Sequence, residues 1–209
     1  MISVKRLPVG QLQTNCYLVK EVGKCVIIDP GDDADYIQRI ISDENLIPTK
    51  IIATHGHFDH ILAVYELKLA YNIPFLMSKY DEFLLKRMSS SAKKFTKITT
   101  GPPPKVDNYL KDKDKLVISN LTLDIILTPG HTPGSVSLYN KEEKIIISGD
   151  LIFSGGGVGR TDFAYSDLDI LNKSVDAILK LPRDTKVYPG HGEATSIDEV
   201  KKYLLPFTP

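Results

Sequence analysis

The chain has 209 residues, 42% of them hydrophobic and 25% charged, and its 26 basic and 26 acidic residues leave no formal net charge. This composition is that of a globular domain and excludes disorder and fibrous repeats, while the balanced charge argues against a nucleic-acid or membrane-surface binder. The apolar runs are too short to cross a bilayer and the N-terminal residues lack the apolar segment of a signal peptide, so we expect a soluble cytoplasmic protein with one domain over residues 1–209.

Short runs of β-branched residues, most of which stop at turn residues, predict the strands. The chain starts with a strand-like alternation over residues 1–6. Further strands are predicted at residues 26–28, 50–53, 123–127, 144–147 and 187–188. Polar residues separate apolar runs at 20–24 and 140–143, which indicates strand hairpins there.

Helices are predicted between these strands. Asp33 and Ser166 can each cap a helix with apolar residues at helical spacing, and residues 61–71 form a further helical stretch. Ser196 and Glu199 have the spacing of a capping box for a short final helix. We interpret residues 89–114, with their serine and proline runs, as a mobile loop. The alternation predicts a layered α/β domain, in which Cys16 and Cys25 act as small buried hydrophobic residues.

All five histidines of the chain lie at strand ends or in the turns that follow them. His55, His57 and His60 lie within six residues after one predicted strand, and His131 and His191 each follow a Pro-Gly pair at the end of another. Scattered core or surface histidines would not share this placement, so we expect the five imidazoles to belong to one site.

The spacing of the histidine cluster suits metal binding. His55 and His57 are two residues apart, so both rings point to one side of an extended segment. Asp59 and His60 follow in a turn and can reach a second point nearby. Imidazole nitrogen and carboxylate oxygen suit Zn²⁺, Fe²⁺ or Mn²⁺, and such a site can leave a position open for catalysis.

Five ordered motifs resemble those of the metallo-β-lactamase-fold hydrolases. Residues 55–60 fit the pattern H-x-H-x-D-H, and the others contain Asp29 in Ile-Asp-Pro-Gly, His131 in Pro-Gly-His-Thr, Asp150 in Ser-Gly-Asp and His191 in Pro-Gly-His-Gly. Residues 14–18, 159–163 and 190–195 are similar to the glyoxalase II-like, or hydroxyacylglutathione hydrolase-like, branch. The resemblance implies a four-layer αββα sandwich with the site along one edge of its two sheets.

The resemblance also implies a role for each of these residues. The first metal would be held by His55, His57 and His131, the second by Asp59, His60 and His191, and Asp150 would bridge the two. Asp29 would steady the 55–60 loop by hydrogen bonds, although a simple turn role before Pro-Gly fits its local sequence as well. We expect two divalent ions, with zinc as the first choice and iron and manganese as alternatives.

Two adjacent divalent ions can share a bridging hydroxide and polarise a carbonyl oxygen. We therefore expect a thioesterase of the hydroxyacylglutathione hydrolase type, in which Asp59 also orients the nucleophile. A thiolate leaves without an acid catalyst, whereas an amine would need one and no sixth histidine remains to supply it.

Glyoxalase II carries a C-terminal helical extension that binds glutathione. Only residues 192–209 follow His191, so we expect no such extension and leave the thiol open.

The metal ions would keep the site positive and favour a small anionic thioester, with no nucleic-acid or membrane partner. The sequence leaves the oligomeric state open. Arg160 could add a second positive charge, although a structural pair with Asp162 is an equal alternative, and Tyr139 and Tyr165 are further candidate substrate contacts. The main alternative function is that of the persulfide dioxygenases, which share H-x-H-x-D-H and Gly-Arg-Thr-Asp-Phe but use one non-haem iron.

Overall fold

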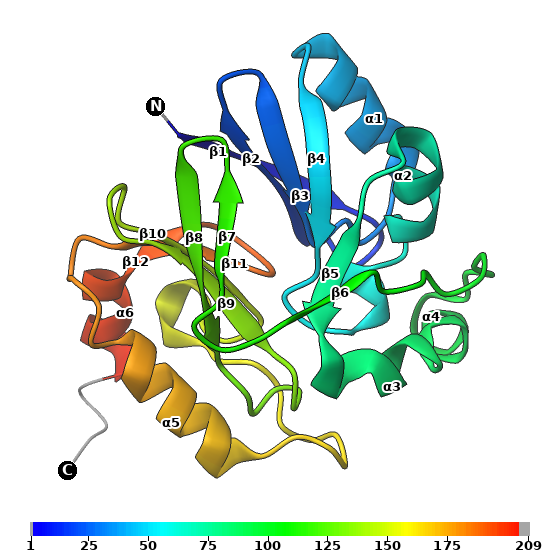
Figure 1. Ribbon diagram of the computed structural model, residues 1–209. Coiled ribbons are helices and arrows are strands. Elements are labelled where there is room, and N and C mark those ends of the chain that lie inside the picture. The colour runs from blue at the N-terminus through cyan, green and yellow to red at the C-terminus, as the bar shows by residue number, and fades with distance from the viewer. Residues whose placement is uncertain (1, 205–209) are drawn as a thin grey trace.

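The computed structural model describes residues 2–204, in which two six-stranded sheets pack face to face (Figure 1). The first sheet has its strands side by side in chain order: β1 (Ser3–Val9), β2 (Thr14–Glu21), β3 (Lys24–Ile28), β4 (Ile47–Ile52), β5 (Phe75–Ser78) and β6 (Asn108–Leu110). The second sheet has the reverse order, from β12 (Thr195–Ser196) through β11 (Lys186–Pro189), β10 (Ile145–Gly149), β9 (Val136–Asn140) and β8 (Leu121–Leu127) to β7 (Lys115–Ile118).

Helices cover the outer faces of both sheets (Figure 1). On the side of the first sheet lie α1 (Ala34–Asp43), α2 (Val64–Tyr71), α3 (Glu82–Leu85) and α4 (Met88–Thr96), and on the side of the second lie α5 (Leu168–Ile178) and α6 (Ile197–Leu204). Short 3₁₀ turns occur at Phe58–His60, Lys79–Asp81 and Ser154–Gly156. The predicted four-layer αββα sandwich is confirmed.

Three apolar layers hold the four structural layers together. Alternate side chains of a strand point to opposite faces of its sheet, so Cys16 and Leu18 of β2 pack under the helices while Tyr17 and Val19 pack between the two sheets. A third layer joins the second sheet to α5 and α6. Both cysteines, Cys16 and Cys25, are fully buried free thiols in the helix-facing layer, as predicted.

The predicted strands and both hairpins are present. The strand at the start of the chain is β1, and β2 and β3 pair antiparallel across the turn at Val22 and Gly23. In the second sheet, β9 and β10 pair in the same way around residues 141–144.

Two of the predicted helix starts need correction. Asp33 is the N-cap residue of α1, as predicted, although its backbone is left-handed (φ 52°) and its carboxylate accepts the backbone N–H of Gly10 rather than one of the helix. The N-cap of α5 is Asp167, which accepts the N–H of Ile170, whereas the Ser166 hydroxyl donates to the carbonyl of His131. The other concerns the helix predicted over 61–71: α2 begins only at residue 64, after a 3₁₀ turn at Phe58–His60 and a turn over residues 61–63.

The prediction of a mobile loop over residues 89–114 is wrong. Most of its first part belongs to α4, and β6 adds a parallel strand to the edge of the first sheet. Met88, Ala92 and Thr96 lie four residues apart and are buried, so one face of α4 packs on the domain.

The proposed capping box at the last helix is half present: Ser196 Oγ accepts the N–H of Glu199 at 3.2 Å, while the Glu199 carboxylate accepts the hydroxyl of Thr195.

The loops that carry the histidines meet at one edge of the sandwich. β8 and β10 run in the same direction because each pairs antiparallel with β9, and β11 is parallel to β10, so the loops after these three strands share an edge. The loop after β4 joins them from the other sheet through the Val136 N–H, which donates to the Thr54 carbonyl at 2.8 Å.

Within residues 2–204, no helix combines the length and apolarity needed to cross a membrane.

Candidate metal centre

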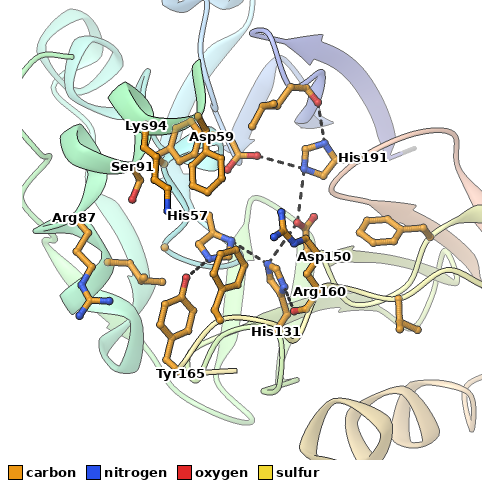
Figure 2. A pocket seen from close by; sticks show the side chains of 18 of the residues that line it. His57, Asp59, Arg87, Ser91, Lys94, His131, Asp150, Arg160, Tyr165 and His191 are labelled. Atoms are coloured by element: carbon orange, nitrogen blue, oxygen red, sulfur yellow. Dashed lines mark hydrogen bonds and ion pairs between the residues drawn. The ribbon is translucent and has the colours of Figure 1, made fainter. Parts of the chain in front are cut away.

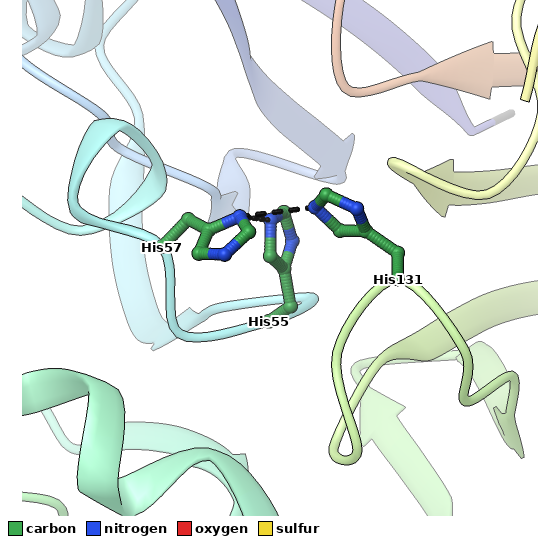
Figure 3. Close-up of side chains that lie close together, drawn as sticks. All are labelled: His55, His57 and His131. Atoms are coloured by element: carbon green, nitrogen blue, oxygen red, sulfur yellow. Dashed lines mark hydrogen bonds between the residues drawn. The ribbon is translucent and has the colours of Figure 1, made fainter. Parts of the chain in front are cut away.

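Three imidazoles converge at the meeting point of two loops. His55 Nε2 lies 3.1 Å from His57 Nδ1, which in turn lies 2.9 Å from His131 Nε2 (Figure 3). Each of these nitrogen atoms can offer a lone pair, and the three converge on one point that a cation can occupy. The three rings therefore form one candidate cation site.

A second group lies beside the first. The ligand atoms of Asp59, His60 and His191 also lie within 4.8 Å of one another. Asp59 Oδ2 is 3.4 Å from His191 Nε2 and 3.8 Å from His60 Nε2. One carboxylate and two imidazoles form a donor set of the kind that divalent transition metals prefer.

The Asp150 carboxylate lies between the two groups. Its Oδ2 is 3.6 Å from His131 Nε2 and 3.7 Å from His191 Nε2, and its Oδ1 is 3.6 Å from His60 Nε2 (Figure 2 shows Asp150 between His131 and His191). Each of the two oxygens can thus reach a different group. All seven side chains predicted as ligands meet at this place.

The buried atoms of the cluster fit metal ions. His60 Nε2 and Asp150 Oδ1 are buried and have no hydrogen-bond partner in the described part of the chain, a costly arrangement unless another group satisfies them. Burial, together with the neighbouring imidazoles, lowers the pKa of His55 and lowers that of His57 to about 3, so these rings stay neutral and keep a free lone pair. Burial opposes protonation of His60 and His191 too, but the neighbouring carboxylates outweigh it and raise the pKa of His60 to about 10 and that of His191 above its ordinary value, so a metal ion bound there would replace a proton.

Backbone carbonyls fix which nitrogen of two rings faces the cluster. His131 Nδ1 donates to the Arg160 carbonyl at 2.8 Å, and His191 Nδ1 donates to the Leu12 carbonyl at 3.1 Å. Since a carbonyl only accepts, Nδ1 carries a proton in both rings, and Nε2 is the nitrogen that faces the cluster. On His57 the outward nitrogen, Nε2, lies 2.8 Å from the Tyr165 hydroxyl.

The Asp29 carboxylate contacts both ends of the segment that carries three of the histidines. Its two carboxylate oxygens accept the backbone N–H and the hydroxyl of Thr54, at 2.6 and 2.7 Å. Oδ2 also lies 3.0 Å from His60 Nδ1. The carboxylate is fully buried, so it holds both the start and the end of the loop in place.

A second buried carboxylate, which the sequence did not reveal, joins the two histidine loops. Asp81 accepts the N–H of Gly56 at 2.9 Å, the N–H of Gly134 at 2.7 Å and the hydroxyl of Thr132 at 2.6 Å. Burial raises the pKa of its carboxyl, and the three hydrogen bonds oppose that rise. Asp81 thereby fixes the loop of His55 and His57 against the loop of His131.

We expect Asp81→Ala to lower the free energy of unfolding by about 3 kcal/mol or more, because each of the three buried donors that it orphans costs roughly 1–3 kcal/mol. Urea unfolding of the metal-free protein measures this without a contribution from metal binding. Asp43→Ala, at an exposed position, is the control and should change stability by less than about 0.5 kcal/mol. Equal stability of the two variants would show that Asp81 does not hold the loops together.

A cavity of about 680 Å³ opens beside the cluster (Figure 2). Of the three candidate substrate contacts, Arg160 and Tyr165 line this cavity, whereas Tyr139 is buried in the layer beneath α5 and α6 and does not line it. The Arg160 guanidinium donates two hydrogen bonds to Asp162, at 2.9 and 2.7 Å, so the pair that the sequence allowed is formed on the rim of the cavity.

One wall of the cavity was missed by the sequence predictions. It consists of residues from α3, α4 and the link between them: Leu84, Arg87, Ser91, Lys94 and Phe95. The four-residue spacing of Met88 and Ala92 was the signal that could have placed a helix there.

Comparison with known proteins agrees with this geometry. A sequence profile of the metallo-beta-lactamase superfamily matches residues 9–191. The "Probable metallo-hydrolase YqgX" of Bacillus subtilis is 36% identical over 197 residues, which are 92% of this chain and 92% of YqgX. The "Hydroxyacylglutathione hydrolase GloC" of Haemophilus influenzae is 31% identical over 210 residues, 96% of each chain.

Solved structures that share this fold include proteins of different kinds. The BLEG-1 B3 metallo-beta-lactamase is 33% identical with a TM-score of 0.91, covering 99% of this chain and 100% of its own. TTHA1623, solved in a di-iron-bound form, is 33% identical with a TM-score of 0.89, covering 98% and 100%. ETHE1 from Myxococcus xanthus is 25% identical with a TM-score of 0.79, covering 96% and 82%. With the profile match over most of the chain and relatives above 30% identity along nearly its full length, this protein belongs to the metallo-beta-lactamase superfamily of metal-dependent hydrolases.

Proposed function

We propose that the protein is a binuclear metal-dependent thioesterase of the hydroxyacylglutathione hydrolase type. The observation that carries the proposal is the position of Asp150, whose carboxylate lies between two separate ligand groups at the floor of an open cavity. The name of GloC, a relative that aligns along nearly the whole chain, supports the substrate class.

Each ligand group would hold one divalent ion, with zinc as the first choice and iron or manganese as alternatives. His55, His57 and His131 would bind the first ion, Asp59, His60 and His191 the second, and Asp150 both. When bound, two such ions activate water as a nucleophile and polarise the carbonyl oxygen of an ester. The di-iron form of TTHA1623 supports a two-metal site.

Asp59 would also orient the attacking water. Its Oδ2 accepts the hydroxyl of Thr14 at 3.1 Å. Burial acts to raise the pKa of Asp59, but the charges and hydrogen bonds of His60 and His191 outweigh burial and lower it, which keeps the carboxylate ionised and able to accept a hydrogen bond from water.

The residues of the site favour a thiolate leaving group. A thiol has an ordinary pKa of about 8.5 and departs as the thiolate without a proton donor, whereas an amine needs one. All five histidines of the chain lie in the ligand cluster, so none is free to donate a proton to an amine. This argues for thioester cleavage over amide cleavage.

Arg160 would contribute to binding an anionic substrate. Its guanidinium lines the cavity and lies 4.9 Å from the centre of the Phe163 ring. Because Asp162 already accepts two of its hydrogen bonds, Arg160 offers only part of its charge to a ligand.

A second candidate function is that of a persulfide dioxygenase with one non-haem iron. The Gly-Arg-Thr-Asp-Phe segment at residues 159–163, which persulfide dioxygenases share, favours it over other oxidoreductases. The two functions differ in metal content, because a dioxygenase of this kind would leave one of the two ligand groups without a resident ion.

Metal analysis combined with a thioester panel tests the proposal. We expect two divalent ions per chain and hydrolysis of S-lactoylglutathione or another acyl-thiol by the metal-loaded protein. A single iron, with oxygen consumption in the presence of a persulfide, would replace the hydrolase with the dioxygenase. Metal-loaded protein that cleaves no thioester would leave only a metal-binding role.

A further inference from the structure

The cavity has a cationic wall on the side of α3 and α4. Arg87, between the two helices, and Lys94, on α4, both line the cavity, and Figure 2 shows them with Ser91 along one side of it, across from Arg160. Both side chains come from the segment that closes the cavity at the edge of the first sheet.

Arg87 and Lys94 have no carboxylate partner. Among residues 2–204, no Asp or Glu oxygen lies within 4.0 Å of either charged group, whereas Arg160 pairs with Asp162. Their cationic groups instead lie 5.4 Å from the ring centres of Phe83 and Phe95, respectively. A guanidinium and an ammonium without acidic partners, both facing one cavity, form a site for an anion.

The rest of the lining is largely apolar. Phe58 and Phe95 stack with their ring centres 6.0 Å apart and their planes at 7°, and Leu84 and Phe163 add further apolar surface. Outside the ligand cluster, the described residues of the lining include no acidic side chain. The cavity therefore suits a molecule with an uncharged reacting end and a negative group some distance along its chain.

We infer that Arg87 and Lys94 form a subsite for a carboxylate or phosphate on the thiol carrier of the substrate, several bonds from its sulfur. This rests on the proposed thioesterase function. The acyl group can differ from one thioester substrate to another, whereas the thiol carrier stays the same. Cations that line the cavity at one place suit the constant part of the substrate, which is the carrier. The wall of α3 and α4 would supply the recognition of the carrier, and Arg160 on the opposite rim would add less because Asp162 shares its charge.

Calorimetric titration of metal-loaded protein with thioethers, which cannot be hydrolysed, tests the subsite without turnover. The probes are S-methylglutathione, which carries carboxylates, S-methyl-coenzyme A, which carries phosphates, and the neutral S-methyl-N-acetylcysteamine. We expect one of the two anionic probes to bind the wild type, and the identity of that probe separates a peptide carrier from a nucleotide carrier. Rising NaCl should weaken this binding.

Arg87→Ala and Lys94→Ala should each raise the dissociation constant of the bound anionic probe about tenfold, as expected for the loss of one charged hydrogen bond. Binding of the neutral probe should change less than about twofold. Lys86→Ala and Lys93→Ala are matched controls, because these exposed lysines are the sequence neighbours of Arg87 and Lys94 but do not line the cavity. They should leave the binding of every probe unchanged.

The outcomes separate the subsite from the catalytic proposal. If neither anionic probe binds the wild type, or if the variants bind it as tightly as the controls do, the subsite is wrong even if thioesters are hydrolysed. If only Arg160→Ala weakens binding, the anion lies on the opposite rim and the inference is overturned. If the anionic probe binds and both variants weaken it, but no thioester is cleaved, the subsite stands and the thioesterase proposal fails.

Discussion

Asp150→Ala is expected to lower the occupancy of both proposed metal positions and to lower kcat/KM for a thioester by about 10³-fold or more, because a loss of several kcal/mol of electrostatic stabilisation corresponds to this factor. The reason is geometric. The Asp150 carboxylate lies 3.6 Å from a nitrogen of each of His60 and His131, and these rings belong to different ligand groups. A single substitution therefore removes a donor from both groups.

The measurement is metal content per chain after dialysis, followed by kcat/KM at saturating metal. Asp184→Ala is a suitable control, because this exposed aspartate pairs with Lys144 at the surface and lies outside the cluster. The control should keep the metal content of the wild type. Unchanged metal stoichiometry in Asp150→Ala would contradict a bridging position for Asp150.

The local sequence was sufficient to predict that the five histidines gather at one place, and the resemblance to the metallo-β-lactamase fold supplied the four layers and the proposed ligand roles. Each ligand follows a strand whose β-branched residues and terminal turn are visible locally, as at residues 50–53 before His55 and residues 187–188 before His191. Strand ends that share an edge then bring these side chains together without any further information. The local pattern thus indicated most of what determines where these side chains lie.

The residues that hold the loops of the site in place were harder to predict, because their role depends on contacts between segments that are distant in the sequence. Asp81 lies 25 residues from Gly56 and 53 from Gly134, and nothing in its local sequence distinguishes it from a turn aspartate. The α4 helix contains three consecutive serines, which have weak helix propensity, so its buried face rather than its composition determines its structure. The misplaced cap of α5 has a similar cause, since Ser166 and Asp167 are both good capping residues and only the contact of Ser166 with the His131 carbonyl decides between them.

Gly190→Ala is expected to disrupt the metal centre although glycine is not a ligand. A Cβ at this position would lie 2.0 Å from Asp150 Oδ1 and 2.9 Å from His60 Cε1, well inside contact distance. The backbone cannot retreat easily, because the Gly190 N–H donates to the Gly149 carbonyl at 2.8 Å and the Gly190 carbonyl accepts the N–H of Asn15 at 2.7 Å. The Asp150 carboxylate must therefore move.

We expect this displacement to lower kcat/KM by about 10²-fold, the loss typical of a misplacement of about 1 Å at a reacting centre, and to weaken metal binding. Gly157→Ala is the matched control, since its Cβ would meet only Phe153 carbon atoms at an ordinary 3.7 Å. That variant should retain the activity and metal affinity of the wild type.

A double-mutant cycle isolates the cause of the Gly190→Ala effect. In metal-free protein, Gly190→Ala should lower the free energy of unfolding of the wild type but change it much less in the Asp150→Ala background, because the side chain that the methyl group displaces is then absent. Equal destabilisation in both backgrounds would assign the effect to the Gly190 backbone itself or to His60. A coupled loss would instead establish that Gly190 is required because the Asp150 carboxylate occupies the space of its missing side chain.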